Sequence, residues 1–256
     1  MSTPESASRF SNRVDDYVRF RPGYPPALLR WLHDEQGVPR EALVADIGAG
    51  TGISSQILLA AGHPLIAVEP NAAMRAAAEH WLGTEYPRFR AADGTAEATG
   101  LADASIGLVS AAQAFHWFDT HAVRREWKRI LAPGGRVLVF WNSRLLDASA
   151  FLRGYEQLLQ EFGTDYSAVA ERYQTDEQMR EWFAGGLQAI GYFPNVQMLD
   201  FDALKGRLLS SSYAPTAGQP NHESMLAALR TLFDQHAVDG KVAFEYQTRA
   251  FLGTLD

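Results

Sequence analysis

The chain contains no cysteine in its 256 residues. Disulfides, thiolate metal sites and a cysteine nucleophile are therefore excluded. No apolar run approaches the roughly 18 residues of a membrane span, and the polar first ten residues lack the apolar core of a signal peptide. We therefore expect a cytoplasmic protein with no membrane partner. We also expect no metal site, because five histidines are scattered without ligand spacing: His63, His80, His121, His222 and His236.

A long basic run is missing as well. The formal net charge is −7, and this acidic balance disfavours nucleic acid as a partner. The contents of hydrophobic residues (46%) and charged residues (21%) are ordinary for a globular protein. The length fits one large α/β domain, or such a domain with a substantial cap.

Apolar runs alternate with helical periods over residues 25–145. Strands are predicted at 42–47, 64–68, 87–91, 106–111 and 136–141, and helices at 27–35, 52–61, 71–81 and 120–131. Repeated βα units predict a parallel sheet with helices on both faces. Beyond residue 146 the pattern favours helices, including 203–212 and 222–236, with one strand at 193–200. Val242, Phe244 and Tyr246 alternate with polar residues, which predicts a final antiparallel strand.

Three glycines at alternate positions, Gly48, Gly50 and Gly52, follow the strand that carries Asp46. Bare backbone at a turn between a strand and a helix lets a ligand approach closely. The dinucleotide fingerprint G-x-G-x-x-G would need a glycine where Ile53 stands. A nucleoside without a pyrophosphate fits better, and a tight connection with no ligand is the alternative.

The next apolar run ends in Glu69, seventeen residues after Gly52. A carboxylate at this place can accept hydrogen bonds from both hydroxyls of a ribose. Pro70 follows, and Asn71 is a suitable cap for the next helix. A solvated loop acid is the alternative reading of Glu69. Together, the glycine turn and the acid on neighbouring parallel strands predict a nucleoside site.

Several motifs resemble those of class I S-adenosylmethionine (SAM)-dependent methyltransferases: Val44 to Gly52, Glu69-Pro70-Asn71 and Leu131 to Gly135. Gly94 to Glu97 and Gln113 to Asp119 are similar to the small-molecule branch that includes type-11 and trans-aconitate methyltransferase-like proteins. The resemblance covers residues 9–145 well and the tail loosely. It implies a Rossmann-like α/β fold with a seven-stranded, mostly parallel sheet, an antiparallel last strand, helices on both faces and a helical cap.

The resemblance also implies SAM as cofactor, S-adenosylhomocysteine (SAH) as product and a small-molecule methyl acceptor as partner. Residues 1–24 would be an arm over the cofactor, 25–145 the SAM-binding core, 146–235 a helical cap with one core strand near 193–200, and 236–256 the strand that completes the sheet. The sequence leaves the acceptor and the oligomeric state open.

The resemblance assigns cofactor roles to matching positions. The glycine turn would face the methionine part of SAM, and Asp46 would orient its amino group or the turn itself. Glu69 would hold the ribose, with Pro70 and Met74 beside the adenine. The family usually has Asp where Thr95 stands, so Thr95 or Asp93 would contact the adenine amino group. The expected cofactor set is completed by Ala49, Ala96, Gln113 and Tyr17.

The segment Phe115-His116-Trp117-Phe118 follows the fourth predicted strand. An imidazole can take up a proton at neutral pH, so His116 is the candidate general base; a structural or substrate-orienting histidine is the alternative. Aromatic faces attract a cationic sulfonium, so Trp117 is a candidate for the acceptor pocket. The alternative is an aromatic cluster that packs strand against helix.

Three further residues are substrate-side candidates: Arg21, Tyr24 and Tyr213. In the resembling family, Arg21 would approach a carboxylate. The expected activity is in-line methyl transfer from SAM to oxygen, nitrogen or carbon. The alternatives are a protein that binds SAM or SAH without catalysis and an NAD-linked oxidoreductase.

Overall fold

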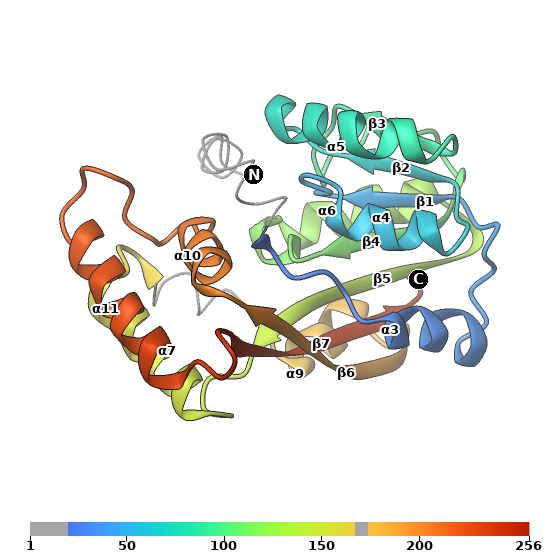
Figure 1. Ribbon diagram of the computed structural model, residues 1–256. Helices are drawn as coiled ribbons and strands as arrows, with labels where there is room; N and C mark the ends of the chain where they lie inside the picture. The colour runs from blue at the N-terminus through green and yellow to red at the C-terminus, as the bar shows by residue number, and fades with distance from the viewer. Residues whose placement is uncertain (1–19, 167–173, 256) are drawn as a thin grey trace.

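The computed structural model describes residues 20–166 and 174–255. Its centre is a seven-stranded sheet in the order β3-β2-β1-β4-β5-β7-β6 (Figure 1). The strands are β1 (Val44–Ile47), β2 (Leu65–Val68), β3 (Phe89–Ala92), β4 (Ile106–Ala112), β5 (Leu131–Arg144), β6 (Leu187–Leu199) and β7 (Val242–Gly253). Strands β1 to β5 pair in parallel, and β7 lies antiparallel between β5 and β6. The predicted fold class is confirmed, including the antiparallel last strand.

Helices cover both faces of the sheet. On one face, apolar side chains of α3 (Pro26–Arg30), the π-helical turn η1 (Trp31–Glu35), α4 (Ile53–Ala60) and α5 (Ala72–Glu85) form one core. On the other face, α6 (Thr120–Ile130) and α9 (Asp176–Phe183) pack around Trp127 and Phe183. Both cores are closed by the apolar residues of the strands between them, as expected for a parallel sheet buried on both sides.

A third core lies away from the parallel strands. Helices α7 (Ala150–Phe162), α10 (Phe201–Leu209) and α11 (His222–His236) pack with Phe244 and Tyr246 at the start of β7. Figure 1 shows this cap at the far end of the long strands β5, β6 and β7. The helical region that begins at 146 therefore contains two kinds of helix, because α9 packs on the sheet while α7, α10 and α11 build the cap.

Two strands are longer than their apolar runs predict. Strand β5 extends from Leu131 to Arg144 instead of 136–141, and β6 begins at Leu187 instead of 193. The C-terminal extension of β5 and the early start of β6 follow from pairing with β7, whose residues Tyr246 to Gly253 match Arg144 to Val137 on one side and whose full length matches β6 on the other. The N-terminal extension of β5 depends on β4 instead, because Leu131 pairs with Ile106 ahead of a shift in register. Backbone pairing prolongs a strand regardless of side-chain polarity, so the run of apolar residues underestimates its length.

The sheet order places the site. Strand β1 has β2 on one side and β4 on the other, so the chain changes direction across the sheet at β1. Ligands in such sheets bind outside the carboxyl ends of the strands at this switch point. In the described ranges, no helix combines the length and apolarity needed to cross a membrane. The same ranges contain no group of three or more metal-ligating side chains.

Candidate functional site

The glycine turn connects β1 to α4, and all three glycines have positive φ: 66° at Gly48, 57° at Gly50 and 93° at Gly52. A Cβ at Gly48 would come within 2.8 Å of Ala114, and one at Gly52 within 2.6 Å of a Leu82 methyl carbon. Gly50 differs, because its Cβ would meet only the Met74 sulfur, at 3.8 Å. Gly48 and Gly52 are therefore required for packing, whereas Gly50 borders open space.

The Glu69 side chain joins the turns after β1 and β2. Its Oε2 accepts the Gly50 N–H at 2.9 Å, and its Oε1 accepts the Asn71 N–H at 2.8 Å. The side chain is buried, and this burial raises the pKa of Glu69, although both amides favour the carboxylate form. Each carboxylate oxygen keeps a second acceptor site. Glu69, the residue predicted to bind the ribose, is thus held in place by the glycine turn itself.

Asp46 lies beneath the turn, fully buried in β1. Its Oδ2 accepts hydrogen bonds from the hydroxyls of Ser54 and Ser55, each at 2.7 Å. Burial raises the pKa of Asp46, against the effect of these hydroxyls. The contacts fix the first turn of α4, and the expected role of Asp46 toward the SAM amino group or the glycine turn stays a prediction. Sequence analysis did not identify the two serines; hydroxyls in the first helical turn after a buried acid were the available signal.

The predicted adenine side lies at the ends of β2 and β3. Arg75 connects them, because its Nη1 donates to the Glu69 carbonyl at 2.6 Å and pairs with Asp93 Oδ1 at 3.2 Å. Asp93 and Pro70 are exposed at this edge, and the hydroxyl of Thr95 accepts the Ala98 N–H at 3.2 Å. Ala96 is buried in the second core. Met74 lies next to Gly50, because its sulfur would be 3.8 Å from a Cβ at that glycine.

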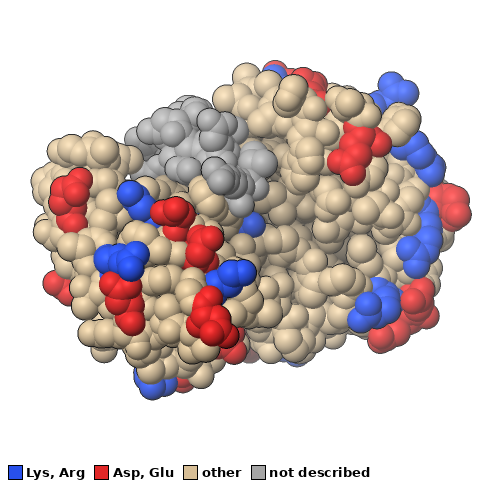
Figure 2. Space-filling view, viewed as in Figure 1, with Lys and Arg blue, Asp and Glu red and all other residues tan. Residues whose placement is uncertain are grey.

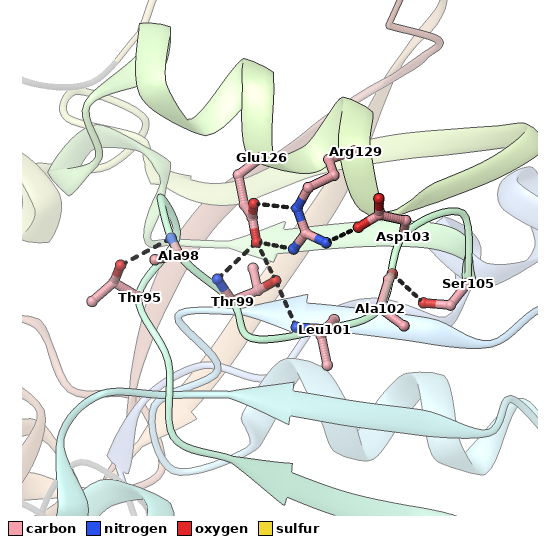
Figure 3. Close-up of polar contacts among 9 residues, drawn as sticks. All are labelled: Thr95, Ala98, Thr99, Leu101, Ala102, Asp103, Ser105, Glu126 and Arg129. Carbon is pink, nitrogen blue, oxygen red and sulfur yellow. Dashed lines mark hydrogen bonds and ion pairs between the residues drawn. The ribbon is translucent and has the colours of Figure 1, made fainter.

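The loop after β3 is attached to α6 by a charged network (Figure 3). Glu126 Oε1 accepts the N–H and hydroxyl of Thr99 at 2.9 and 2.6 Å, while Arg129 donates two hydrogen bonds to the same carboxylate, at 2.8 and 2.7 Å. Arg129 also pairs with Asp103. The hydrogen bonds from Arg129 lower the pKa of Glu126 to about 2. Sequence analysis missed this network, which holds the loop carrying Asp93 and Thr95.

The turn after β4 faces the glycine turn. Gln113 has a positive φ of 58°, and its Oε1 accepts the Asn142 N–H of β5 at 2.9 Å. The ring of His116 lies 4.9 Å from that of Trp117. A small cavity is lined by Gln113, Ala114, Phe115, His116, Trp141 and Gln174. Phe115 and Phe118 also pack against Trp127 in the second core, so the aromatic segment both packs the helix and borders the site.

The remaining candidates are spread more widely. Tyr17 lies outside the described residues. The ring of Tyr24 packs edge-on against Phe140 of β5, with centroids 4.6 Å apart. Arg21 Nη2 donates to the Ser210 carbonyl at 2.7 Å, and Tyr213 follows the same helix end, 5.1 Å from the Tyr166 ring. Arg21 and Tyr213 thus belong with the cap, while His116 and Trp117 lie at the sheet edge.

The chain is similar in sequence to known methyltransferases. A family model described as a methyltransferase domain matches residues 45–139. An uncharacterized methyltransferase of Mycobacterium bovis is 31% identical over 250 residues, which are 96% of this chain and 95% of that protein. An uncharacterized methyltransferase of Schizosaccharomyces pombe is 33% identical, over 53% of each chain.

Solved structures share the fold. A protein of Anaeromyxobacter dehalogenans assigned to the type II methyltransferases has a TM-score of 0.67 and 24% identity, over 92% of this chain and 98% of that one. The phosphoethanolamine N-methyltransferase 2 of Haemonchus contortus, solved with phosphomonomethylethanolamine and SAH, has a TM-score of 0.56 and 18% identity. That match covers 95% of this chain and 57% of the other.

Proposed function

The chain belongs to the class I SAM-dependent methyltransferases, and from this premise we propose that it methylates a small-molecule acceptor. One observation carries the proposal: the Gly50 amide and the buried Glu69 carboxylate are hydrogen-bonded to each other at the switch point of the sheet. The membership decides against the NAD-linked oxidoreductase. Cytoplasmic location stays a prediction.

The residues at this edge fit an adenosyl cofactor. Gly50 has no side chain, and a Cβ built there would have only the Met74 sulfur within 4 Å, at 3.8 Å, so a ligand can lie against this side of its backbone. Glu69 offers acceptor sites in a buried position, where hydrogen bonds to a charged group are strong. Apolar contact with an adenine ring is available from Met74. Glu69 would hold the ribose of SAM, Gly50 would face its methionine part, and Met74 would lie beside its adenine.

The chemistry needs alignment more than proton transfer. When bound, SAM supplies a methyl group on a sulfonium that is already a strong electrophile. The task of this chain is then to hold the acceptor atom in line with the carbon–sulfur bond and to exclude water, which contributes roughly 7–11 kcal/mol to rate enhancement in well-oriented systems. We assign the acceptor to the space between the β4 turn and the cap. There Trp117 would pack on it, and His116 would accept a proton where the acceptor has one to lose.

Two measurements test the proposal. Calorimetry of the purified protein with SAH should show stoichiometric binding, and absence of binding at millimolar SAH would refute the adenosyl site. Transfer of a radiolabelled methyl group to a panel of small acids, phenols and amines should identify an acceptor. SAH binding without transfer to any member of the panel, or to material from a metabolite extract, would instead favour the non-catalytic binding protein.

A further inference from the structure

The cap buries an arginine that forms no ion pair with the acids the structure describes. Arg207 of α10 is 6% exposed. Its Nε donates to the Tyr246 hydroxyl at 3.0 Å and its Nη1 to the Ser211 hydroxyl at 3.1 Å, and its guanidinium lies 5.4 Å from the Phe244 ring centroid. Within residues 20–166 and 174–255, no acid forms an ion pair with it. A buried charge without a counter-charge is costly, so such a charge is a sign of function rather than of stability.

A second arginine lies in the same core with a donor to spare. Arg144, at the end of β5, pairs with Glu156 and donates to the Tyr166 hydroxyl at 2.8 Å. Its Nη1 is buried and has no hydrogen-bond partner among the described residues. The guanidinium lies 5.3 Å from the ring centroid of Tyr155, whose hydroxyl is also buried without a partner there. Arg144 Nη1 and the Tyr155 hydroxyl are thus two buried donors without an acceptor in the described part of the protein.

The charges do not cancel. Arg207 and Arg144 carry two positive charges, and Glu156 carries the one negative charge that opposes them in the described part of this core. The imbalance also acts on Tyr213: burial raises its pKa, but Arg207, Arg21 and Arg144 outweigh burial and bring the pKa below its usual value. By contrast, acidic and basic side chains are interspersed on the outer face of the cap in Figure 2. The excess of positive charge therefore lies inside the cap.

We propose that Arg207, Arg144 and Tyr155 bind a singly charged anionic group of the methyl acceptor, such as a carboxylate. The group would accept hydrogen bonds from Arg144 Nη1 and the Tyr155 hydroxyl and would oppose the charge of Arg207. This inference rests on the proposed function, because it names the substrate class of the same enzyme. One negative charge balances Arg207 and Arg144 against Glu156, which favours a carboxylate over a doubly charged phosphomonoester. Arg21 donates to the Ser210 carbonyl at 2.7 Å and is left out of this balance.

The cluster lies on the acceptor side of the sheet. Arg144 stands two residues after Asn142 on β5, and the Asn142 N–H donates to Gln113 of the β4 turn at 2.9 Å. Arg21, just before α3, donates to the last turn of α10, the helix that carries Arg207. An acceptor with its carboxylate in the cap would therefore extend its other end toward the turn that carries His116 and Trp117.

Binding of simple carboxylates to the SAH complex tests the proposal. Calorimetry with acetate, succinate and benzoate, and with phenyl phosphate as the phosphomonoester, should show at least one carboxylate bound and phenyl phosphate bound more weakly. Arg207→Met should weaken carboxylate binding at least about tenfold, since the buried charge that opposes the anion is lost, and Tyr155→Phe about threefold, since one hydrogen bond is lost. Arg230→Met is the matched control, because Arg230 also lies over aromatic rings of the cap but pairs with Asp234.

Two further readouts separate binding from a structural role. Tyr155→Phe removes a hydroxyl with no described partner, so the melting temperature should stay constant or rise while carboxylate affinity falls. In near-ultraviolet titrations, carboxylate should raise the ionisation midpoint of the tyrosine that is lost in Tyr213→Phe. If SAH binds but no carboxylate does, or if Arg207→Met binds as the parent does, the anion site is refuted and the methyltransferase proposal stands. If SAH itself does not bind, the proposed function fails first.

Discussion

The Gly50 N–H donates to Glu69 Oε2 across 2.9 Å, which joins the turns of two neighbouring strands through one backbone amide and one buried carboxylate. The Asn71 N–H donates to the other carboxylate oxygen at 2.8 Å, so both oxygens of Glu69 are held by backbone amides. The conformation of the glycine turn and the position of the Glu69 carboxylate therefore depend on each other. A substitution at Gly50 or at Glu69 is expected to change both.

Replacement of Glu69 by alanine should weaken SAH binding at least tenfold, about 1.4 kcal/mol. The variant loses the predicted ribose contact and leaves the amides of Gly50 and Asn71 without their acceptor. Glu69→Gln keeps one acceptor oxygen and should lose less. Calorimetry with SAH measures both, with Glu79→Ala as the control, because Glu79 is an exposed acid of α5. An unchanged dissociation constant for Glu69→Ala would remove the ribose role.

Gly50→Ala should weaken SAH binding at least tenfold while costing only the conformational penalty of a left-handed residue, about 1 kcal/mol of unfolding free energy. Space for the Cβ exists in the protein, but that space is assigned to the cofactor. Gly37→Ala is the matched control: its φ of 63° is close to the 57° of Gly50, and nothing lies within 4 Å of its Cβ. We expect the two variants to lose about the same unfolding free energy, whereas only Gly50→Ala should bind SAH more weakly. Equal affinity would exclude Gly50 from the site.

The cofactor side could be predicted from sequence because its signals are local. The glycine turn, Glu69 and the Asn71 cap each lie within a few residues of a strand end, and the Asn71 side chain does accept two amides of α5. Parallel pairing then brings these ends together without further information. Strand lengths were less predictable, because the C-terminal end of β5 and the start of β6 depend on pairing with β7, which is distant in sequence from β5.

The cap cluster and the loop network could not be predicted in this way. Arg207 and Tyr246 lie 39 residues apart, and Thr99 and Glu126 lie 27 apart. Each of these residues by itself is an ordinary helix or loop residue. Only packing of the cap shows that Arg207 is buried, and burial is what turns a common charged residue into a candidate ligand.

The stability of the protein should depend on Glu126 at acidic pH. The folded-state pKa of about 2 lies below the ordinary value of 4.5, so the carboxylate stabilises the fold above pH 4.5, and this contribution is lost as the pH falls through about 2. We expect a contribution of about 1 kcal/mol at neutral pH, after allowance for solvent screening. Chemical denaturation of the parent and Glu126→Gln should differ at pH 7 and converge toward pH 2.

Asp46 and Glu69 act in the opposite direction, since burial raises their pKa values and their ionisation on raising the pH costs stability. The difference between parent and Glu126→Gln cancels these effects, because both proteins contain both acids. A difference that stays constant down to pH 2 would show that the Thr99–Glu126–Arg129 contacts do not stabilise the folded state.

The proposed role of His116 can be separated from cofactor binding. If this histidine accepts the proton of the acceptor, His116→Ala should lower kcat by a factor of about 10² to 10⁴ while the SAH dissociation constant stays unchanged. The histidine borders the cavity after β4, whereas Glu69 lies at the end of β2. His121→Ala is the control, because His121 lies five residues later and is exposed on α6. With an acceptor identified by the transfer screen, a kcat within a few-fold of the parent would show that the proton leaves by another route, or that the acceptor has none to lose. A rise in KM with unchanged kcat would instead place His116 among the residues that orient the acceptor.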